Sequence, residues 1–186
     1  LLHGRSLGSL LKEGPLAPHK VIEIGLDLLD GLVAAHGAGI VHRDLKPDNV
    51  FLLDDPSEVR LKVLDFGVAK NLQSTGQSAV LTKPGATVGT PSYMSPEQAR
   101  AAPIDERTDV WSAGALLFHA ATGRPPWVEA SIPTLLLKLV TQVPPRLEEL
   151  VPEAPGRLRA AIDGALQPEL DKRWKSAADM AAALRG

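Results

Sequence analysis

The chain has 186 residues, 44% of them hydrophobic, and a formal net charge of −2 at pH 7. This length corresponds to about one domain, and the apolar content is sufficient for a buried core. The mixed charges give no sign of a nucleic-acid partner, and the lack of cysteine excludes a disulfide framework and a thiolate metal site. No apolar run is long enough to span a bilayer, and no signal peptide is visible. We therefore expect a cytoplasmic protein with no membrane segment within this chain.

The first long element is an amphipathic helix over residues 18–38. Pro18 suits its first turn, and Gly37 and Gly39 end it. Four apolar residues recur at helical spacing and predict its buried stripe: Ile22, Leu26, Leu29 and Val33. His36 falls on the same stripe, so we interpret it as a core histidine rather than a ligand.

Two short runs of apolar, branched residues, 49–53 and 60–64, lie on either side of Asp54-Asp55-Pro56-Ser57. They predict a small β-hairpin. Residues 109–121 are apolar nearly all round, which predicts a fully buried helix. Two further helices are expected over 132–140 and 156–166. Ser176, followed three residues later by Asp179, predicts a capping box at the start of the last helix.

Residues 42–49 read His-Arg-Asp-Leu-Lys-Pro-Asp-Asn and carry the strongest chemical signal. Pro47 excludes a helix interior and favours an extended Lys46, so Asp44, Lys46 and Asn49 lie on a short loop of restricted geometry. A carboxylate for a hydroxyl proton, a cation for a phosphate and an amide oxygen for Mg²⁺ are the groups that phosphoryl transfer needs. A plain polar connector is the alternative. The segment resembles the catalytic loop of protein kinases through all its signature positions.

Two later segments strengthen this resemblance. Asp65-Phe66-Gly67 follows Asp44 by 21 residues and resembles the kinase Asp-Phe-Gly triplet. Residues 89–97 resemble the end of a kinase activation segment, although Ser95 stands where the family usually has alanine. In that family Glu97 would be buried and would need a cationic partner, for which Arg173 is suitably placed.

The resemblance implies the fold of a protein kinase catalytic domain, specifically a bacterial Ser/Thr kinase of the eukaryotic-like (Hanks) type. Residues 1–186 would form the mainly α-helical C-terminal lobe, a helical bundle with a small β-hairpin at the active site. Residues 2–11 resemble the segment just after the inter-lobe hinge. We find no glycine-rich phosphate loop and no strand lysine, so the N-terminal β lobe is absent from this sequence.

The resemblance also implies roles for individual residues. Asp44 would orient the acceptor hydroxyl, Lys46 would steady the phosphate, and Thr90 would bond towards both, a Ser/Thr-type feature. Asn49 and Asp65 would hold Mg²⁺, with Mn²⁺ as a substitute. ATP would rest on Phe51, for which an ordinary core position is the alternative. The implied structural residues are His42, Phe66, Glu97, Asp109 and Arg173. Among them, Asp109 would anchor the backbone of the catalytic loop. The alternative for Asp109 is a simple acid at a helix N-terminus.

The expected function is transfer of the ATP γ-phosphoryl group to Ser/Thr hydroxyls of protein substrates. Arg43 beside Asp44 suggests control by phosphorylation at Thr82 or Thr87, with Ser78 as a further candidate. A kinase dimer for trans-autophosphorylation is an expected partner, and the chain could be the cytoplasmic part of a membrane-anchored kinase. Without its N-terminal lobe the chain alone is expected to be inactive. Two alternatives remain: a solitary non-catalytic lobe that acts as a binding module, and a weaker case, a small-molecule kinase.

Overall fold

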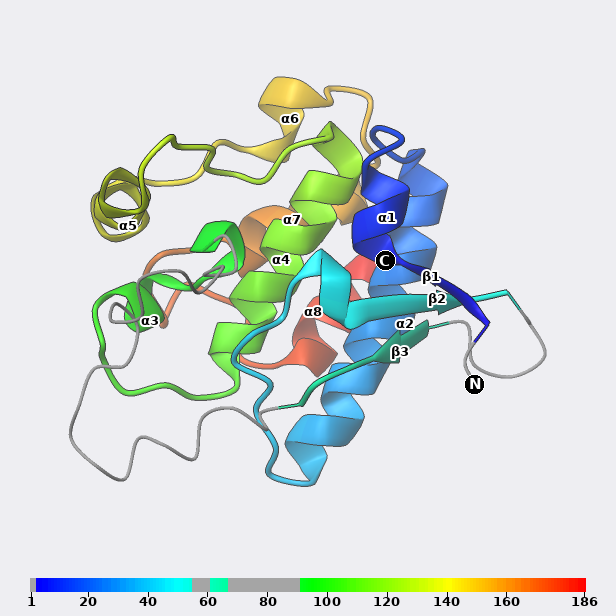
Figure 1. Cartoon of the computed structure of the whole chain (residues 1–186), viewed down its shortest axis with the longest axis horizontal. Helices are drawn as coiled ribbons and strands as arrows, with labels where there is room; N and C mark the ends of the chain where they lie inside the picture. Colours follow the sequence, from blue (N-terminus) through cyan, green and yellow to red (C-terminus); the bar gives the residue numbers. More distant parts are fainter. Residues whose placement is uncertain (1–2, 55–60, 67–90) are drawn as a thin grey trace.

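The computed structural model describes residues 3–54, 61–66 and 91–186, and these residues form a helical bundle with one small sheet (Figure 1). The elements before residues 42–49 are β1 (Gly4–Ser6), α1 (Leu7–Leu11) and α2 (Pro18–Gly37). Those next to it are η1 (Pro47–Asn49), β2 (Val50–Leu53) and β3 (Leu61–Val63). The remaining elements are η3 (Pro91–Tyr93), α3 (Pro96–Ala99), α4 (Arg107–Thr122), α5 (Ile132–Thr141), α6 (Leu147–Leu150), α7 (Gly156–Ala165) and α8 (Ala177–Arg185).

Helix α4 is the centre of the bundle. Nearly all of its residues are buried, including Trp111 and Phe118, as the largely apolar sequence of residues 109–121 predicts. Gly114 allows α7 to approach closely, because a Cβ at this position would lie 2.6 Å from the Cβ of Ala165. The helix ends at Gly123, whose φ of 78° is the left-handed conformation that glycine adopts without strain.

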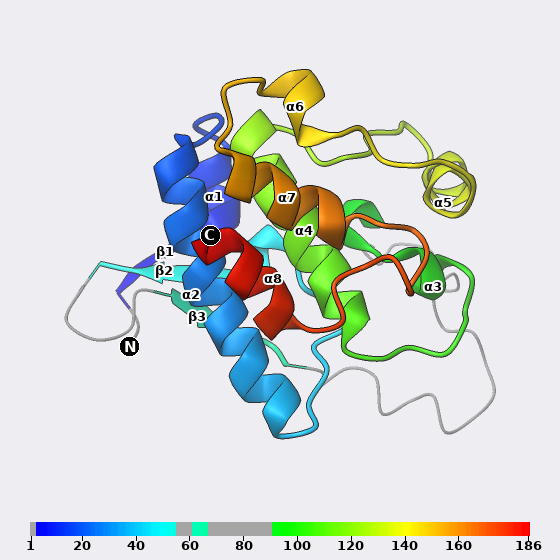
Figure 2. The same cartoon turned by 180° about the vertical axis from the view of Figure 1, so that it is seen from behind.

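Helix α2 packs between two layers. The sheet covers one side of it and α8 the other, as the two opposite views show (Figures 1 and 2). The predicted helix is confirmed, but its predicted buried stripe is too narrow and partly wrong. Val33 is 39% exposed and Leu26 is only partly buried, whereas the buried set is wider: Val21, Ile22, Ile24, Gly25, Leu28, Leu29 and Leu32. A helix with neighbours on more than one side buries more than one row of side chains.

The sheet has three antiparallel strands in the order β1-β2-β3. The predicted hairpin is present as β2 and β3, with Val50 opposite Val63. Strand β1 was not predicted; it pairs with β2 so that Gly4 lies opposite Leu53. Only glycine fits at position 4, because its φ is 149° and a Cβ would lie 2.0 Å from the Leu52 carbonyl oxygen.

The outer helices follow their sequence signals closely. The predicted helices over 132–140 and 156–166 are present as α5 and α7. Ser176 caps α8, because its Oγ accepts the Asp179 N–H at 3.1 Å. The predicted capping box is nevertheless incomplete, since the Asp179 carboxylate accepts the Ser176 hydroxyl (2.9 Å) rather than its backbone N–H. Among the described helices, none is both long and apolar enough to cross a membrane.

Candidate active site

The loop between α2 and η1 carries Asp44 and Lys46, and Asp109 on α4 holds its backbone. Asp109 is fully buried. Its Oδ2 accepts the His42 backbone N–H at 2.7 Å, and its Oδ1 accepts the Arg43 backbone N–H at 2.9 Å. Arg43 has a φ of 67°, a left-handed conformation that is strained for a residue with a side chain. The two bonds to Asp109 therefore help to hold the loop in a shape that its sequence alone would not favour.

His36 is a third partner of Asp109 that the sequence did not reveal. Its Nε2 lies 2.9 Å from Asp109 Oδ2, and its side chain is 6% exposed. The sequence predicted a core histidine, and the His36 side chain is indeed buried. The contact of His36 with Asp109 was not predicted. A buried carboxylate is unfavourable unless hydrogen bonds surround it, and Asp109 receives them from His36, His42 and Arg43. The position of Asp109 in the first turn of α4 also matches the alternative, a favourable acid at a helix N-terminus.

His42 joins the loop to the segment that contains Asp65. The His42 side chain is buried; its Nδ1 accepts the Asp44 N–H at 3.2 Å, and its Nε2 lies 2.9 Å from the Leu64 carbonyl oxygen. These contacts assign a neutral ring with the proton on Nε2, because Nδ1 must accept while Nε2 donates. The ring also meets Phe66 edge-on, with centroids 5.0 Å apart. Phe66 is partly buried, and its structural role stays a prediction.

The residues expected to carry chemistry lie together around this framework. Asp44 is exposed, and Lys46 Nζ lies 3.2 Å from its Oδ2. Asn49 is 7% exposed, and its Nδ2 donates to the Asp44 carbonyl oxygen at 2.9 Å. The Leu64 N–H donates to the Asn49 carbonyl oxygen at 2.8 Å, which brings Asp65 next to the loop. Asp44, Lys46 and Asn49 are therefore joined by contacts within the loop, and the backbone places Asp65 beside them.

Asn49 and Asp65 fit the oxygen preference of Mg²⁺. The Asn49 NH₂ group is committed to Asp44, so the atom that remains to ligate is Oδ1. Asp65 is exposed, with a φ of 58°. No cluster of three or more His, Cys, Asp or Glu side chains able to hold a metal occurs within the described residues. Two protein oxygens suit an ion that keeps water and phosphate oxygens as its other ligands, which is the habit of Mg²⁺.

Phe51 lies on β2 beside the site. It is partly buried, and its backbone pairs with Ser6 on one side and Lys62 on the other. A Cβ on Gly4 would lie 2.9 Å from Phe51 Cε1, so β1 packs directly over this ring. Whether Phe51 supports adenine stays a prediction.

The predicted ion pair between Glu97 and Arg173 is present and buried. Arg173 Nη1 lies 2.8 Å from Glu97 Oε1, and Nη2 lies 3.1 Å from Oε2, which is the bidentate geometry. Thr108 Oγ1 adds a third bond, to Oε1, at 2.7 Å. Burial alone would raise the pKa of Glu97, but the bonds and charge of Arg173, with the Thr108 hydroxyl, leave it below its usual value. The pair connects α3 to the segment before α8.

Arg43 leaves part of its guanidinium without a partner. Its Nε is buried and has no hydrogen-bond partner among the residues that the structure describes. The Arg43 backbone carbonyl accepts Gln98 Nε2 at 2.7 Å, which ties the loop to α3. The other residues expected in regulation or substrate contact lie outside the described ranges: Gly67, Ser78, Thr82, Thr87 and Thr90.

Two polar contacts near the site were missed by the sequence analysis. Tyr93 Oη lies 2.6 Å from His119 Nδ1, and Ser112 Oγ donates to the Tyr93 carbonyl oxygen at 2.8 Å. A signal was available, because Ser112 and His119 are polar residues within an otherwise apolar, buried helix. A polar group in such a helix requires a partner.

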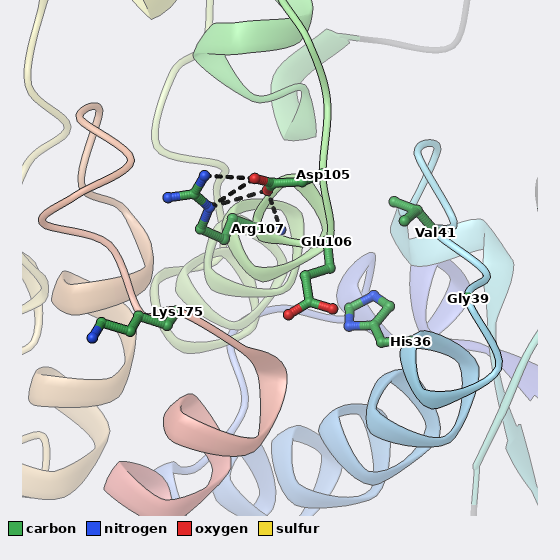
Figure 3. A pocket seen from close by; sticks show the side chains of 7 residues that line it. All are labelled: His36, Gly39, Val41, Asp105, Glu106, Arg107 and Lys175. Carbon is green, nitrogen blue, oxygen red and sulfur yellow. Dashed lines mark hydrogen bonds and ion pairs between the residues drawn. The ribbon is translucent and has the colours of Figure 1, made fainter.

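A surface pocket of about 390 Å³ lies beside His36 (Figure 3). Its lining consists of His36, Gly39, Val41, Asp105, Glu106, Arg107 and Lys175. Asp105 and Arg107 form an ion pair on its wall, and hydrogen bonding to Arg107 lowers the pKa of Asp105. The Glu106 carboxylate lies next to the His36 ring, whereas Lys175 extends away from it. The pocket contains no chemical residue of the loop, so it is separate from the cluster around Asp44.

Comparison with known proteins gives one consistent family. Residues 1–178 match the family model described as protein kinase domain. The chain is 39% identical over 176 residues to the serine/threonine-protein kinase PknB of Mycolicibacterium smegmatis, covering 92% of this chain and 27% of that protein. It is 39% identical over 171 residues to the serine/threonine-protein kinase pkn3 of Myxococcus xanthus, covering 91% and 31% respectively. The chain thus spans less than a third of these relatives.

A solved structure shares the fold. The kinase domain of Mycobacterium tuberculosis PknI superposes with a TM-score of 0.72 at 24% identity, and the match covers 100% of this chain and 62% of that one. The matched family model, the similarity to bacterial serine/threonine kinases and the shared fold agree with the motifs at residues 42–49, 65–67 and 89–97. The chain therefore belongs to the protein kinase domain family.

Proposed function

We propose that this chain is the larger, C-terminal lobe of a Ser/Thr protein kinase, which transfers the γ-phosphoryl group of ATP to hydroxyls of protein substrates. The observation that carries the proposal is the cluster of Asp44, Lys46, Asn49 and Asp65, held together by contacts from Asp109 and His42. Degeneration of the site would be expected to remove one of these side chains, and all four are present.

Each residue has a defined task in the proposed reaction. Asp44, exposed at the end of the loop, accepts or orients the proton of the attacking hydroxyl. Lys46, which lies beside Asp44, places its positive charge against the transferring phosphate. Asn49 Oδ1 and the Asp65 carboxylate hold Mg²⁺ or, as a substitute, Mn²⁺. When bound, the ion neutralises charge that develops on the phosphate oxygens.

Residues 1–186 supply only part of the groups that the proposed reaction needs. Residues 1–186 contain no glycine-rich loop and no strand lysine for the nucleotide phosphates. We therefore propose that transfer requires the family's N-terminal lobe and that this lobe packs over Phe51 and β2. Residues 1–186 by themselves would then not transfer phosphate.

The substrate class follows from the family resemblance. Lys46 two residues after Asp44 is the Ser/Thr kinase pattern, and the relatives found are named serine/threonine kinases. Thr90 would bond towards Asp44 and Lys46. The proposed location is the cytoplasm, either free or as the cytoplasmic part of a membrane-anchored kinase.

Phosphorylation is the proposed means of control. Arg43 Nε is buried and has no partner among the described residues, so it is a donor that a phosphate oxygen could satisfy, because a phosphate brings about −1.5 to −2 charge and three acceptors. Thr82 and Thr87 are the proposed sites, modified in trans within a kinase dimer. The test is a Thr82→Ala, Thr87→Ala double variant of the intact kinase, and unchanged activity would refute this control.

The central experiment concerns Asp44. In the intact kinase, Asp44→Asn should abolish transfer of ³²P from ATP to a protein acceptor while nucleotide affinity stays nearly unchanged. The matched control is Asp171→Asn, which makes the same change at an exposed carboxylate. Retained transfer in Asp44→Asn would contradict the proposal. Absence of transfer in the wild-type intact protein would favour the binding-module alternative instead.

A further inference from the structure

The pocket beside His36 forms where three segments far apart in the sequence meet (Figure 3). These segments are the end of α2 with the turn that follows it, the residues that lead into α4, and Lys175, shortly before α8. The volume of about 390 Å³ lies within the range of small-molecule sites in proteins. Because the pocket shares no residue with the cluster around Asp44, a ligand there would occupy a second site.

Among the described residues, the pocket wall has one carboxylate and one ammonium without an ion pair. Asp105 and Arg107 neutralise each other, with Arg107 Nε 3.0 Å from Asp105 Oδ2. The two groups that remain belong to Glu106 and Lys175. They lie apart, because the Glu106 carboxylate is next to the His36 ring and Lys175 extends away from it (Figure 3). The charges of these four side chains cancel, so the wall favours neither a net cation nor a net anion.

The His36 end of the pocket presents hydrogen-bond acceptors. The Asp109 carboxylate only accepts, so His36 Nε2 donates to it, and in the neutral ring Nδ1 is then an acceptor. His36 Nδ1 is buried and has no hydrogen-bond partner within the described ranges. The neighbouring Glu106 carboxylate is an acceptor too and cannot supply the missing donor. Two adjacent acceptors, one of them negative, suit a group with several N–H bonds and a positive charge, which is a primary ammonium.

The end of α2 adds to this preference. Gly39 and Val41 line the pocket directly after the last turn of this 20-residue helix. The C-terminus of a helix carries partial negative charge and stabilises a cation placed near it. The helix end and Glu106 therefore favour a cation at one end of the pocket, whereas Lys175 favours an anion away from the His36 ring.

We propose that this pocket binds a small zwitterion, with its primary ammonium at Glu106 and His36 Nδ1 and its carboxylate at Lys175. The site does not depend on the proposed phosphoryl transfer. Its occupant would nevertheless act on the loop at residues 42–49. His36 bonds Asp109, which in turn accepts the backbone N–H groups of His42 and Arg43. A ligand that fixes the His36 ring would stabilise this arrangement against local opening.

The first test is isothermal titration calorimetry of the intact kinase with ω-amino acids from glycine to 6-aminohexanoate. The series varies the separation of the two charges, because the flexible Lys175 side chain reaches over a range of distances. At least one member should bind, the alkylamine of the same length should bind about two- to fivefold more weakly, and the matching carboxylate should bind weakest. Absence of binding throughout the series, or equal binding of an amino acid and its matching carboxylate, would overturn the proposal.

Three variants locate the ligand. Glu106→Gln should weaken binding of the amino acid by about tenfold, since the ammonium loses a charged acceptor. Lys175→Gln should weaken it by about two- to fivefold and leave the alkylamine unaffected. Glu153→Gln is the matched control, at an exposed glutamate outside the pocket lining, and should change neither affinity. Unchanged affinity in Glu106→Gln, with Tm equal to that of the wild type, would rule out this pocket as the site.

Hydrogen exchange measures the link to the loop. With ligand at about ten times its Kd, amide exchange at His42 and Arg43 should slow by up to about tenfold, the limit set by mass action. Glu106→Gln at the same ligand concentration should show little slowing. Binding without any change at these two amides would refute the link through Asp109. Binding by a wild type that transfers no phosphate would refute the proposed function and leave this site intact.

Discussion

One oxygen of Asp109 accepts the backbone N–H of His42 at 2.7 Å, although the two residues are 67 positions apart. The same carboxylate accepts the next N–H along the loop and meets His36 from α2. The loop's shape is therefore set by a side chain from a distant helix rather than by local turn chemistry.

Asp109→Asn should destabilise the fold and loosen the loop together. An amide has one acceptor oxygen in place of two, so an NH₂ group would face one of the two backbone N–H groups. We expect a loss of about 2–4 kcal/mol of unfolding free energy in urea titrations, because buried donors would lose a charged acceptor. Amide exchange at His42 and Arg43 should accelerate. Asp171→Asn, at an exposed position, should leave both measurements unchanged.

Removing one partner of the Glu97–Arg173 pair should lower the free energy of unfolding more than removing both partners. Arg173→Met leaves a buried carboxylate whose remaining side-chain partner among the described residues is Thr108, so unfolding free energy should fall by about 3–5 kcal/mol. The combination of Glu97→Gln with Arg173→Met should cost clearly less, since no buried charge remains. Equal or additive losses, measured by urea unfolding, would contradict this account.

Stability should fall in acid in two windows. The pKa of His119 is lowered by burial, so the unfolded chain binds its proton first, and stability is lost as pH falls below about 6.5. The pKa of Glu97 is also lowered, so its contribution is complete above about pH 4.3 and is lost as pH falls through the lower folded value. Urea midpoints between pH 8 and 3 measure both. His119→Asn should reduce the fall in the urea midpoint in the window below about pH 6.5 only. Glu97→Gln should reduce the fall in the more acidic window only.

Gly114→Ala should destabilise the bundle by overpacking. The added Cβ would lie 2.6 Å from the Cβ of Ala165, a side chain with no freedom to move away. We expect a loss of about 1–3 kcal/mol, seen as a lower Tm. Gly37→Ala is the matched control: a Cβ there meets nothing within 4 Å, so this change should be neutral or stabilising by about 0.4–1 kcal/mol. A similar decrease in Tm for both variants would contradict the overpacking argument.

The sequence predicted what is encoded locally. Helix ranges followed from periodicity and from terminal signals such as Pro18 and Ser176, and the short motif at residues 42–49 was enough to indicate the family. The Glu97–Arg173 pair was predicted as well, but through the resemblance to kinases and not from the residues alone.

Contacts between distant elements were harder to predict. Strand β1 has only three residues and gains its conformation by pairing with β2, which no local pattern reveals. Val33 matched the helical period but is 39% exposed. The partners of His36 and His119 depend on which helices meet. Periodicity predicts burial, but it does not predict which polar groups come together.

The link from Asp109 to the loop has a consequence for biosynthesis. A ribosome adds about 5–20 residues each second, so Asp109 is made about 3–13 seconds after His42. Until then the nascent loop lacks the carboxylate that holds Arg43 in its left-handed conformation. The partner of Glu97 appears later still, 76 residues after Glu97 itself. A growing chain would therefore acquire an ordered loop at residues 42–49 only after α4 has been made and has packed.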